Sequence, residues 1–520
     1  MKSRKTIFYN VKLSLMDLVG KDYVDGVCAA RAWLSGEDKR QWKAIASEKV
    51  DFYPGAFQQK LIELLPRVGR VCCRPLKRSA HGATTAAFQA RANPALGPLS
   101  CLSFLRLAED GRLFLTSKSE HYHVPLGHGF PGYRLIEHGR KLGIPNATHN
   151  NTRGHITRLL EEELVRTAAG VPRGDRTALD RLLNSKRKSA LNRVLNLQTG
   201  SLAAEAAIKM VLSRFYRTQA DSPDPRYKGR VPVMVVIGGD QGGHEANYHG
   251  TTVLAQTMRG MWPDLIDGFE KHEIMLVRSV RPNDIDELEA VFAKYDRGRY
   301  KIAGFFHEFI LMNYGGISLS EPFVRRAYLL CKRNDVPTIA DEIQSCIWSP
   351  ELYMYREYGV KPDFVVIGKG FPGGEYAASR ILFSTAMDSL PQFGALVTNG
   401  QEELASLAYL ITMRWAEANA DVTRAVGDYY EEQLKNLRTQ YPGIISAIEG
   451  KRHMAGIYFH ELAKGTAFVN QLNGAGLDIS IQTYKHGCPP SALTKLPLTV
   501  GFEVVDMVIS RMESALKRIS

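Results

Sequence analysis

The sequence predicts an α/β protein whose sheet is mostly parallel. Between about residues 110 and 400, short apolar runs rich in β-branched residues alternate with runs of helical spacing, which is the pattern of an α/β domain. Two of these runs are followed directly by charged residues. Asp341 follows the first run, in VPTIADE at 336–342, and Lys369 follows the second, in DFVVIGKG at 363–370. In an open parallel sheet, residues just past the carboxyl ends of strands face the ligand crevice. A carboxylate and an amine at this edge predict a ligand that uses both.

The other elements of this stretch support the same fold. RVPVMVVIGG and YKIAGFFHEFIL have the apolar character of buried strands. EPFVRRAYLLCKRND has helical spacing, with Phe323, Ala327 and Cys331 at intervals of three to four. VPTIADE and DFVVIGKG then form the next two strands along the chain. After about residue 400 the chain becomes helical in EELASLAYLITMRWAEA and then ends in a short mixed region, which is typical of a small C-terminal domain.

These patterns divide the chain into three parts. Residues 1–105 form an N-terminal extension of mixed character and unknown role, which includes a loop of small residues. Residues 106–400 form the large, ligand-binding domain, and their N-terminal segment contributes to the small domain. Residues 401–520 form that small C-terminal domain. No internal repeat or low-complexity segment is visible.

Composition narrows the class of protein. Apolar residues make up 44% and charged residues 23% of 520 residues, which is ordinary for a globular protein, and no apolar run is long enough for a transmembrane helix. The net charge is +13, but the basic residues are spread out and the densest cluster, NSKRKSALNR at 184–193, is short. This favours an ordinary basic surface over a nucleic-acid or membrane partner. Seven cysteines without metal-ligand spacing suit reduced thiols in the cytoplasm.

Asp341 and Lys369 allow two interpretations. One is a structural ion pair. The other is a pyridoxal phosphate site, in which the lysine amine forms a Schiff base with the cofactor aldehyde and the carboxylate keeps the pyridine nitrogen protonated. The second interpretation requires a phosphate cradle, usually backbone N–H groups at a helix N-terminus. NLQTGSLAAEAAIKMVL fits, because Thr199, Gly200 and Ser201 form a small turn before an Ala-rich, helix-forming run.

The chain resembles the class III aminotransferases, pyridoxal phosphate enzymes of fold type I. The match runs over about 410 residues, from near Asp110 to the C-terminus, and its specificity lies in the shared order and spacing of short segments. The segments are PLGHGFP, TGSLAAEAAIKM, ANYHGTT, HEFILMNYGGI, IADEIQS, PDFVVIGKGFPGG and VTNGQEELASLAYL. The resemblance implies a large domain on a mostly parallel, seven-stranded type of sheet and a small C-terminal α+β domain.

The resemblance also implies which side chains contact the cofactor ring. Lys369 would form the Schiff base and move a proton during the reaction, and Asp341 would pair with the pyridine nitrogen. Gln344 would contact the ring hydroxyl. Tyr248 would stack on the ring face, and His249 beside it is assigned to the same cofactor-binding element.

Other matched positions would surround the phosphate and the substrate side of the ring. Gly200 and Ser201 would bind the phosphate, with Thr199 flanking them, and Glu308 would lie beside the substrate side. Thr398 would bind the phosphate of the neighbouring subunit. The resemblance therefore implies a homodimer with shared active sites.

The expected activity is transfer of an amino group between an amino acid or amine and a 2-oxo acid. Departures from the family pattern, such as Leu202 and Phe309, leave the cofactor anchors intact but leave the reaction open. A racemase, epimerase, aminomutase or carbon-bond-forming enzyme on the same scaffold is the alternative. A cofactor-binding regulator and a basic nucleic-acid binder are alternatives of another class. The identity of the substrate stays open.

The sequence gives weaker evidence of function for two further sets of basic residues. His121, His123 and His128 lack an acidic or cysteine framework at fixed spacing, so we expect no metal site there. Lys495, in TKLPLTV, lies near the position where many class III aminotransferases have a substrate-binding arginine. The resemblance implies that Lys495 receives a substrate carboxylate, and a solvated lysine is the alternative.

Overall fold

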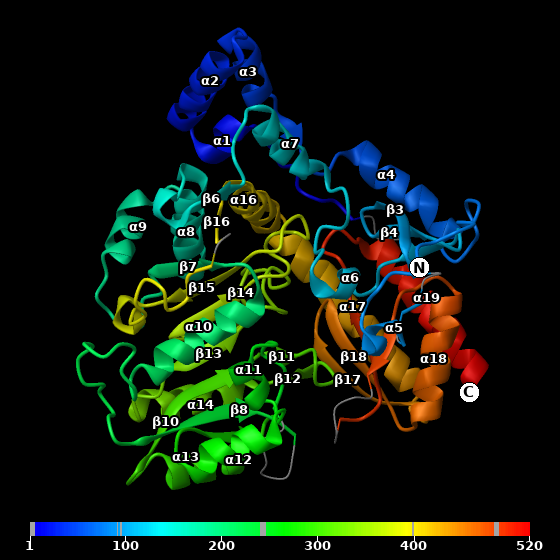
Figure 1. Cartoon of the computed structure of the whole chain (residues 1–520). Coiled ribbons are helices and arrows are strands. Elements are labelled where there is room, and N and C mark those ends of the chain that lie inside the picture. The colour runs from blue at the N-terminus through cyan, green and yellow to red at the C-terminus, as the bar shows by residue number, and fades with distance from the viewer. Residues whose placement is uncertain (1–5, 91, 94–95, 240–245, 398–399, 483–487) are drawn as a thin grey trace.

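Seven strands form the main sheet of the computed structural model, which describes residues 6–90, 92–93, 96–239, 246–397, 400–482 and 488–520 (Figure 1). The strands lie in the order β7-β15-β14-β13-β10-β8-β9. β15 is antiparallel to both of its neighbours and the remaining pairs are parallel, so the predicted α/β fold with a mostly parallel sheet is confirmed. The strands are β7 (Arg193–Leu197), β8 (Val231–Ile237), β9 (Leu276–Val280), β10 (Tyr300–His307), β13 (Thr338–Asp341), β14 (Phe364–Ile367) and β15 (Ser379–Phe383).

β8 and β14 are buried along their whole length, which explains why they are apolar throughout. Successive side chains of a strand point to opposite faces. In β8, Val233 and Val235 therefore belong to the larger hydrophobic cluster, whereas Met234 and Val236 belong to the cluster that includes the Ala-rich helix α10. Small alanines let α10 approach the sheet closely, and this holds the N-terminus of α10 at the sheet edge.

Helices cover the sheet and continue into the C-terminal part. The helices of the central region are α7 (Arg134–Lys141), α8 (His155–Ala168), α9 (Arg176–Leu183), α10 (Gly200–Leu212), α11 (Val253–Thr257), α12 (Pro263–Lys271), α13 (Ile285–Tyr295), α14 (Glu321–Arg333) and α15 (Met354–Glu357). The C-terminal helices are α16 (Glu403–Ala418), α17 (Ala420–Gln440), α18 (Leu462–Gly474) and α19 (Phe502–Ile519). Among the described residues, no helix is both long and apolar enough to cross a membrane.

A second, antiparallel sheet lies beside the C-terminal helices, to the right of the main sheet in Figure 1. Its order is β17-β18-β20-β19. Its strands are β17 (Ile445–Lys451), β18 (Met454–Phe459), β19 (Ser480–Gln482) and β20 (Ser491–Lys495). Short two-residue strands pair elsewhere as β11 (Ile310–Leu311) with β12 (Ile317–Ser318), and as β6 (Ala147–Thr148) with β16 (Gln401–Glu402).

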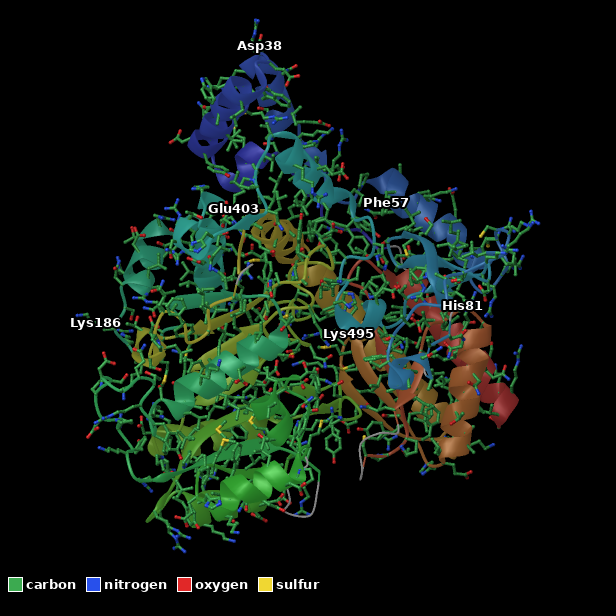
Figure 2. All side chains as sticks on the ribbon, viewed as in Figure 1. Asp38, Phe57, His81, Lys186, Glu403 and Lys495 are labelled. Atoms are coloured by element: carbon green, nitrogen blue, oxygen red, sulfur yellow. The ribbon has the colours of Figure 1, made fainter. Side chains whose placement is uncertain are left out.

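The N-terminal region forms a helical projection and a small sheet. Figure 1 shows α1, α2 and α3 at the top of the molecule, and Figure 2 places Asp38 at their tip. The elements are β1 (Lys12–Leu13), α1 (Leu15–Val19), α2 (Lys21–Ser35), α3 (Lys39–Ser47), β2 (Val50–Asp51), α4 (Gly55–Leu64), α5 (Ala86–Gln89), β3 (Pro98–Leu102), β4 (Leu105–Ala108), β5 (Leu113–Leu115) and α6 (Ser119–Tyr122). The division of the chain at residues 105 and 400 stays a prediction.

Candidate active site

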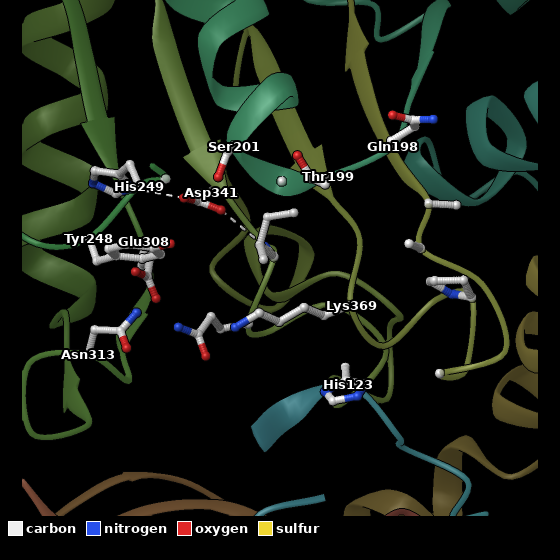
Figure 3. Close-up of a pocket in the computed structure, with 18 of the residues that line it drawn as sticks. His123, Gln198, Thr199, Ser201, Tyr248, His249, Glu308, Asn313, Asp341 and Lys369 are labelled. Atoms are coloured by element: carbon white, nitrogen blue, oxygen red, sulfur yellow. Dashed lines mark hydrogen bonds and ion pairs between the residues drawn. The ribbon is translucent and has the colours of Figure 1, made fainter. Parts of the chain in front are cut away.

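The carboxyl ends of several main-sheet strands deliver the predicted site residues to one cavity. Thr199 follows β7, Glu308 follows β10, Asp341 ends β13 and Lys369 follows β14. All four side chains line a cavity of about 680 Å³ (Figure 3). These strands point the same way, so their ends meet at one edge of the sheet, as the sequence predicted.

The backbone at Lys369 is held in an unusual conformation. Lys369 has a φ of +37°, a region that residues with a Cβ atom rarely adopt. Its neighbours are both glycines. A Cβ atom on Gly370 would lie 2.6 Å from the Ile347 side chain, and one on Gly368 would lie 3.0 Å from Ser379 Oγ. The GKG sequence thus allows a tight turn that directs a long amine into the cavity. Such strain is typical of functional sites.

The environment of Lys369 favours the neutral amine. Burial lowers the pKa of Lys369, while the nearby carboxylates of Glu308 and Asp341 act in the opposite direction. A lysine with a lowered pKa carries more of the unprotonated form, which is the form that attacks an aldehyde.

Asp341 is positioned by two hydrogen bonds. Its Oδ2 lies 2.8 Å from His249 Nδ1, and its Oδ1 accepts a hydrogen bond of 3.1 Å from the backbone N–H of Ile343. The His249 ring packs against Phe306, with ring centroids 4.3 Å apart. Asp341 and His249 are both buried. The carboxylate therefore has a set direction, and His249 lies behind it as a positioning residue.

Glu308 is a fully enclosed carboxyl group close to Asp341. The Asn247 amide donates a hydrogen bond to Glu308 Oε1. Burial raises the pKa of Glu308 well above its ordinary value, and the Asp341 charge raises it further, although Lys369 opposes the shift. Two carboxyl groups in one dry site favour protonation of one of them, and we expect the proton on Glu308.

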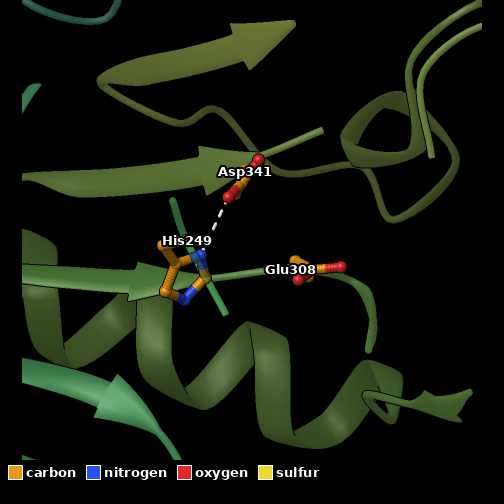
Figure 4. A group of neighbouring side chains, drawn as sticks. All are labelled: His249, Glu308 and Asp341. Atoms are coloured by element: carbon orange, nitrogen blue, oxygen red, sulfur yellow. Dashed lines mark hydrogen bonds and ion pairs between the residues drawn. The ribbon is translucent and has the colours of Figure 1, made fainter. Parts of the chain in front are cut away.

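His249, Glu308 and Asp341 also form a cluster of possible metal ligands. One ligand atom from each lies within 4.8 Å of the others (Figure 4). The sequence predicts no metal site, and its local spacing draws attention only to the histidines between 121 and 128. The three members of this cluster are far apart in the chain and come together only through strand order.

The N-terminus of α10, where the sequence predicts a phosphate cradle, lines the same cavity. Thr199 is the N-cap residue, and its Oγ1 accepts a hydrogen bond of 3.4 Å from Leu202 N–H. Ser201 Oγ accepts a hydrogen bond of 3.0 Å from Thr251 N–H. A Cβ atom on Gly200 would lie 2.7 Å from the end of the Ile343 side chain, so a larger residue there would require Ile343 to move. The turn presents backbone N–H groups at the positive end of a helix dipole.

Tyr248 and Gln344 line the same cavity, on the loop after β8 and after β13 respectively. Gln344 is buried, and its Oε1 has no hydrogen-bond partner among the described residues. The same holds for Glu308 Oε2 and His249 Nε2. Buried polar atoms normally have partners, so these three atoms indicate a polar ligand. Thr398 lies outside the described residues, and its position stays a prediction.

Lys495 does not occupy the substrate-facing position that the resemblance implied. Its side chain is fully buried and is not among the residues that line the cavity. Its Nζ donates to the main-chain oxygen of Gln344 and lies 3.7 Å from the centroid of the Trp348 ring. Burial lowers the pKa of Lys495 well below its ordinary value. The solvated alternative for Lys495 is therefore wrong, and its binding of a substrate carboxylate stays a prediction. Figure 2 shows it between the main sheet and the C-terminal helices.

Sequence reasoning missed several residues of the cavity wall. His123, Asn313 and Tyr376 line the cavity from three separate loops, and Arg259 lines it from the turn after α11. None stands at the end of an apolar run. No local pattern distinguishes these residues from ordinary surface residues, so only the folded chain reveals them.

Solved aminotransferase structures have this fold. An aminotransferase from Vibrio fluvialis, solved in a PMP-bound form, superposes with a TM-score of 0.67 over 85% of this chain and 96% of its own, at 16% identity. The ornithine aminotransferase of Toxoplasma gondii superposes with a TM-score of 0.64 over 82% of this chain and 91% of its own, at 17% identity. The protein therefore has the fold type I architecture of the aminotransferases.

Sequence comparison identifies the family within this class. The model of the class III aminotransferases matches residues 168–516, so the chain belongs to that family. An ornithine aminotransferase from Exiguobacterium is 26% identical over 61% of this chain and 74% of its own length. An acetylornithine aminotransferase from Synechocystis is 26% identical over 50% of this chain. The chain spans 58% of the length of the Synechocystis enzyme, and 58% of an acetylornithine aminotransferase from Aquifex aeolicus.

Proposed function

We propose that the protein is a pyridoxal phosphate-dependent aminotransferase that moves an amino group between an amino acid or amine and a 2-oxo acid. The observation that carries the proposal is the convergence of Lys369, Asp341 and the turn at Thr199–Ser201 on one cavity. These groups can bind an aldehyde, a pyridine nitrogen and a phosphate, which are the three groups by which proteins hold this cofactor. Membership of the class III family supports the same activity.

The residues present fit the cofactor. The N-terminus of α10, with Gly200 and Ser201, would hold the phosphate. Asp341 would face the ring nitrogen, and Tyr248 offers a flat aromatic surface to the ring. The unsatisfied Gln344 Oε1 offers an acceptor to the ring hydroxyl. Glu308 Oε2, also unsatisfied, would lie beside the ring on the substrate side.

When bound, pyridoxal phosphate supplies an electron sink for the carbanion that forms when an amino compound loses its α-proton. The protein residues prepare the site for this chemistry. Lys369 Nζ would bond the aldehyde carbon with loss of water and later move the proton at the substrate carbon. Burial lowers the pKa of Lys369, which favours the unprotonated amine that this bond requires. The negative charge of Asp341 would hold a proton on the ring nitrogen, and His249 keeps that carboxylate in place.

We assign the cluster of His249, Glu308 and Asp341 to the cofactor rather than to a metal ion. Asp341 Oδ2 already pairs with His249 Nδ1, so that nitrogen and that oxygen are engaged with each other. A raised pKa at Glu308 also favours a neutral carboxyl group, which is a poor metal ligand. The organic cofactor uses these groups without displacing their mutual hydrogen bond.

An absorbance experiment tests the proposed activity. Purified protein loaded with pyridoxal phosphate is mixed with amino donors, with and without 2-oxo acids, while the visible band of the lysine-bound cofactor is followed. We expect the donor alone to bleach the band once, and a 2-oxo acid to restore it with formation of a new amino acid. Product formed from the donor without any oxo-acid acceptor would instead support a racemase or another enzyme of that group.

We further propose that the active unit is a homodimer. Large apolar side chains are exposed in two segments, one from the start of α11 to the turn that follows it, and the other in the loop before residue 398. They are Val253, Met261, Trp262, Phe393 and Leu396. Exposed apolar clusters of this kind mark protein interfaces, and obligate interfaces resemble a core cut in half. A two-fold axis would bury both segments twice and bring residue 398 towards the partner's phosphate cradle.

Hybrid dimers test whether sites are shared. Subunits with Lys369→Ala are mixed with subunits carrying Thr398→Glu, dissociated and reassociated. Each hybrid then has one site with both residues intact, so random pairing should restore about a quarter of the wild-type activity. As a control, Lys369→Ala is mixed with Asp341→Asn. These residues serve the same subunit's site, so this mixture should stay inactive. Verified hybrids of the first pair without any recovered activity would contradict shared sites.

The location that we propose is the cytoplasm. The structure pairs none of the seven cysteines in a disulfide, and Cys28, Cys331 and Cys346 are buried. Proteins of oxidising compartments commonly pair their cysteines, so free thiols support a reducing compartment. Donor and acceptor are small molecules, and we propose no nucleic-acid partner.

A further inference from the structure

The turn after α11 places a guanidinium group in the wall of the active-site cavity. Arg259 is half-buried and lines the cavity together with Tyr248. Its Cζ lies 5.4 Å from the centroid of the Tyr248 ring, which is a cation–π arrangement. The loop between them is anchored at Thr251, whose N–H donates to Ser201 Oγ. Arg259 therefore stands on the same wall as the aromatic ring, one short helix after the loop that is held by Ser201.

Most other charged side chains in the cavity wall have a hydrogen-bond partner or a role in the proposed reaction. Asp341 is paired with His249, and Glu308 accepts from Asn247. Lys369 is the amine that the proposed reaction uses. Of the residues that the structure describes in the cavity wall, Arg259 is the only arginine. Lys495, the cation that the resemblance pointed to, lies behind Gln344 and outside the wall.

The chemistry of an arginine in such a place points to a carboxylate. A guanidinium stays protonated at physiological pH and presents its donors as a planar fork, which matches the two oxygens of a carboxylate. Contact with an aromatic face orients the guanidinium plane, and partial burial strengthens the pairing relative to water. We propose that Arg259 binds a carboxylate of the amino substrate, so that the enzyme prefers amino acids to simple amines; this inference rests on the proposed function.

Paired substrates test this preference. The holoenzyme and its Arg259→Gln and Arg259→Lys variants are assayed with alanine and with ethylamine, which is alanine without its carboxyl group. Loss of a charged hydrogen-bonded pair should raise the KM for alanine in Arg259→Gln by about 10- to 100-fold, with kcat changed much less. Arg259→Lys should give an intermediate value, since it keeps the charge but loses the fork. The ethylamine KM should not change.

A binding measurement separates this inference from the proposed activity. Calorimetric titration of the holoenzyme with glutarate, a dicarboxylate without an amino group, reports carboxylate binding even if no amino donor reacts. We expect Arg259→Gln to weaken glutarate binding by a similar factor. The matched control is Arg297→Gln, which removes an exposed arginine of the α13–β10 turn and should leave both measurements unchanged.

Three outcomes would overturn the role of Arg259. The first is an alanine KM that is unchanged in Arg259→Gln. The second is an equal change for alanine and ethylamine. The third is a selective loss of affinity for pyridoxal phosphate with an unchanged ratio of the two KM values, which would make Arg259 a phosphate ligand of the cofactor. A wild-type protein that converts neither compound, yet binds glutarate through Arg259, would count against the proposed function alone.

Discussion

Replacing Lys369 by alanine is expected to abolish covalent attachment of pyridoxal phosphate and to lower turnover by about a thousandfold or more. Lys369 supplies the only amine among the described cavity-lining side chains. Without it, no protein nitrogen can bond the cofactor aldehyde, and no lysine can move the proton at the substrate carbon. The measurement is the visible absorbance of the loaded protein, followed by borohydride reduction and mass spectrometry of the trapped peptide.

The Lys369→Ala protein should still fold. Burial lowers the pKa of the Lys369 amine, so truncating this side chain removes a desolvation cost together with its attraction to Glu308 and Asp341. We expect its thermal unfolding without cofactor to match the wild-type protein. Lys361→Ala is the matched control, since Lys361 is exposed just before β14 and should trap the cofactor normally. A Lys369→Ala protein that still traps the cofactor covalently and turns over substrate would overturn the assignment.

Replacing Asp341 by asparagine is expected to leave the fold intact and lower turnover by about 100- to 1,000-fold or more. The carboxamide has the same shape, so it can keep the contacts with Ile343 N–H and His249 Nδ1. It lacks the negative charge that holds a proton on the ring nitrogen. Steady-state kinetics measure the loss, and Asp264→Asn, an exposed change in the first turn of α12, serves as the control.

A cofactor analogue can show that charge is the cause of that loss. Pyridoxal phosphate methylated at the ring nitrogen keeps a positive charge without a proton. In the Asp341→Asn protein this analogue should recover part of the lost activity, because the ring no longer depends on the carboxylate. The Asp341 charge also raises the pKa of Glu308, so the same variant should make Glu308 easier to ionise. Near-normal turnover of Asp341→Asn with the ordinary cofactor would contradict the assignment.

The strands that carry the site could be predicted because their signal is local. A strand buried on both faces needs apolar residues along its whole length, and the runs around β8, β10, β13 and β14 show this directly. A polar residue directly after such a run is easy to recognise, and Asp341 and Lys369 are two such residues. The turn at Thr199–Ser201 was visible for a similar reason, because an Ala-rich helix follows it.

The contacts within the site were not visible in the sequence. The pairing of His249 with Asp341 and the closeness of Glu308 to Asp341 depend on the order in which strands lie in the sheet. Strand order depends on packing between segments that are distant in the chain. Such packing produces no periodic pattern in the sequence of any one segment. The left-handed backbone at Lys369 is likewise a result of its surroundings, although the flanking glycines allow it.

The sequence by itself determined the α/β class, the strand ends that bear Asp341 and Lys369, and the small turn at the start of α10, because side-chain alternation and helix propensity act over a few residues. Only the tertiary structure decided which cations face the cavity. Lys495 looked available in the sequence, yet β20 pairs with β18 and β19 so that its side chain is enclosed beside Trp348. Arg259 had no motif around it, yet the turn after α11 places it in the wall. The direction of a side chain depends on what packs against its element, and for both residues those partners are distant in the chain.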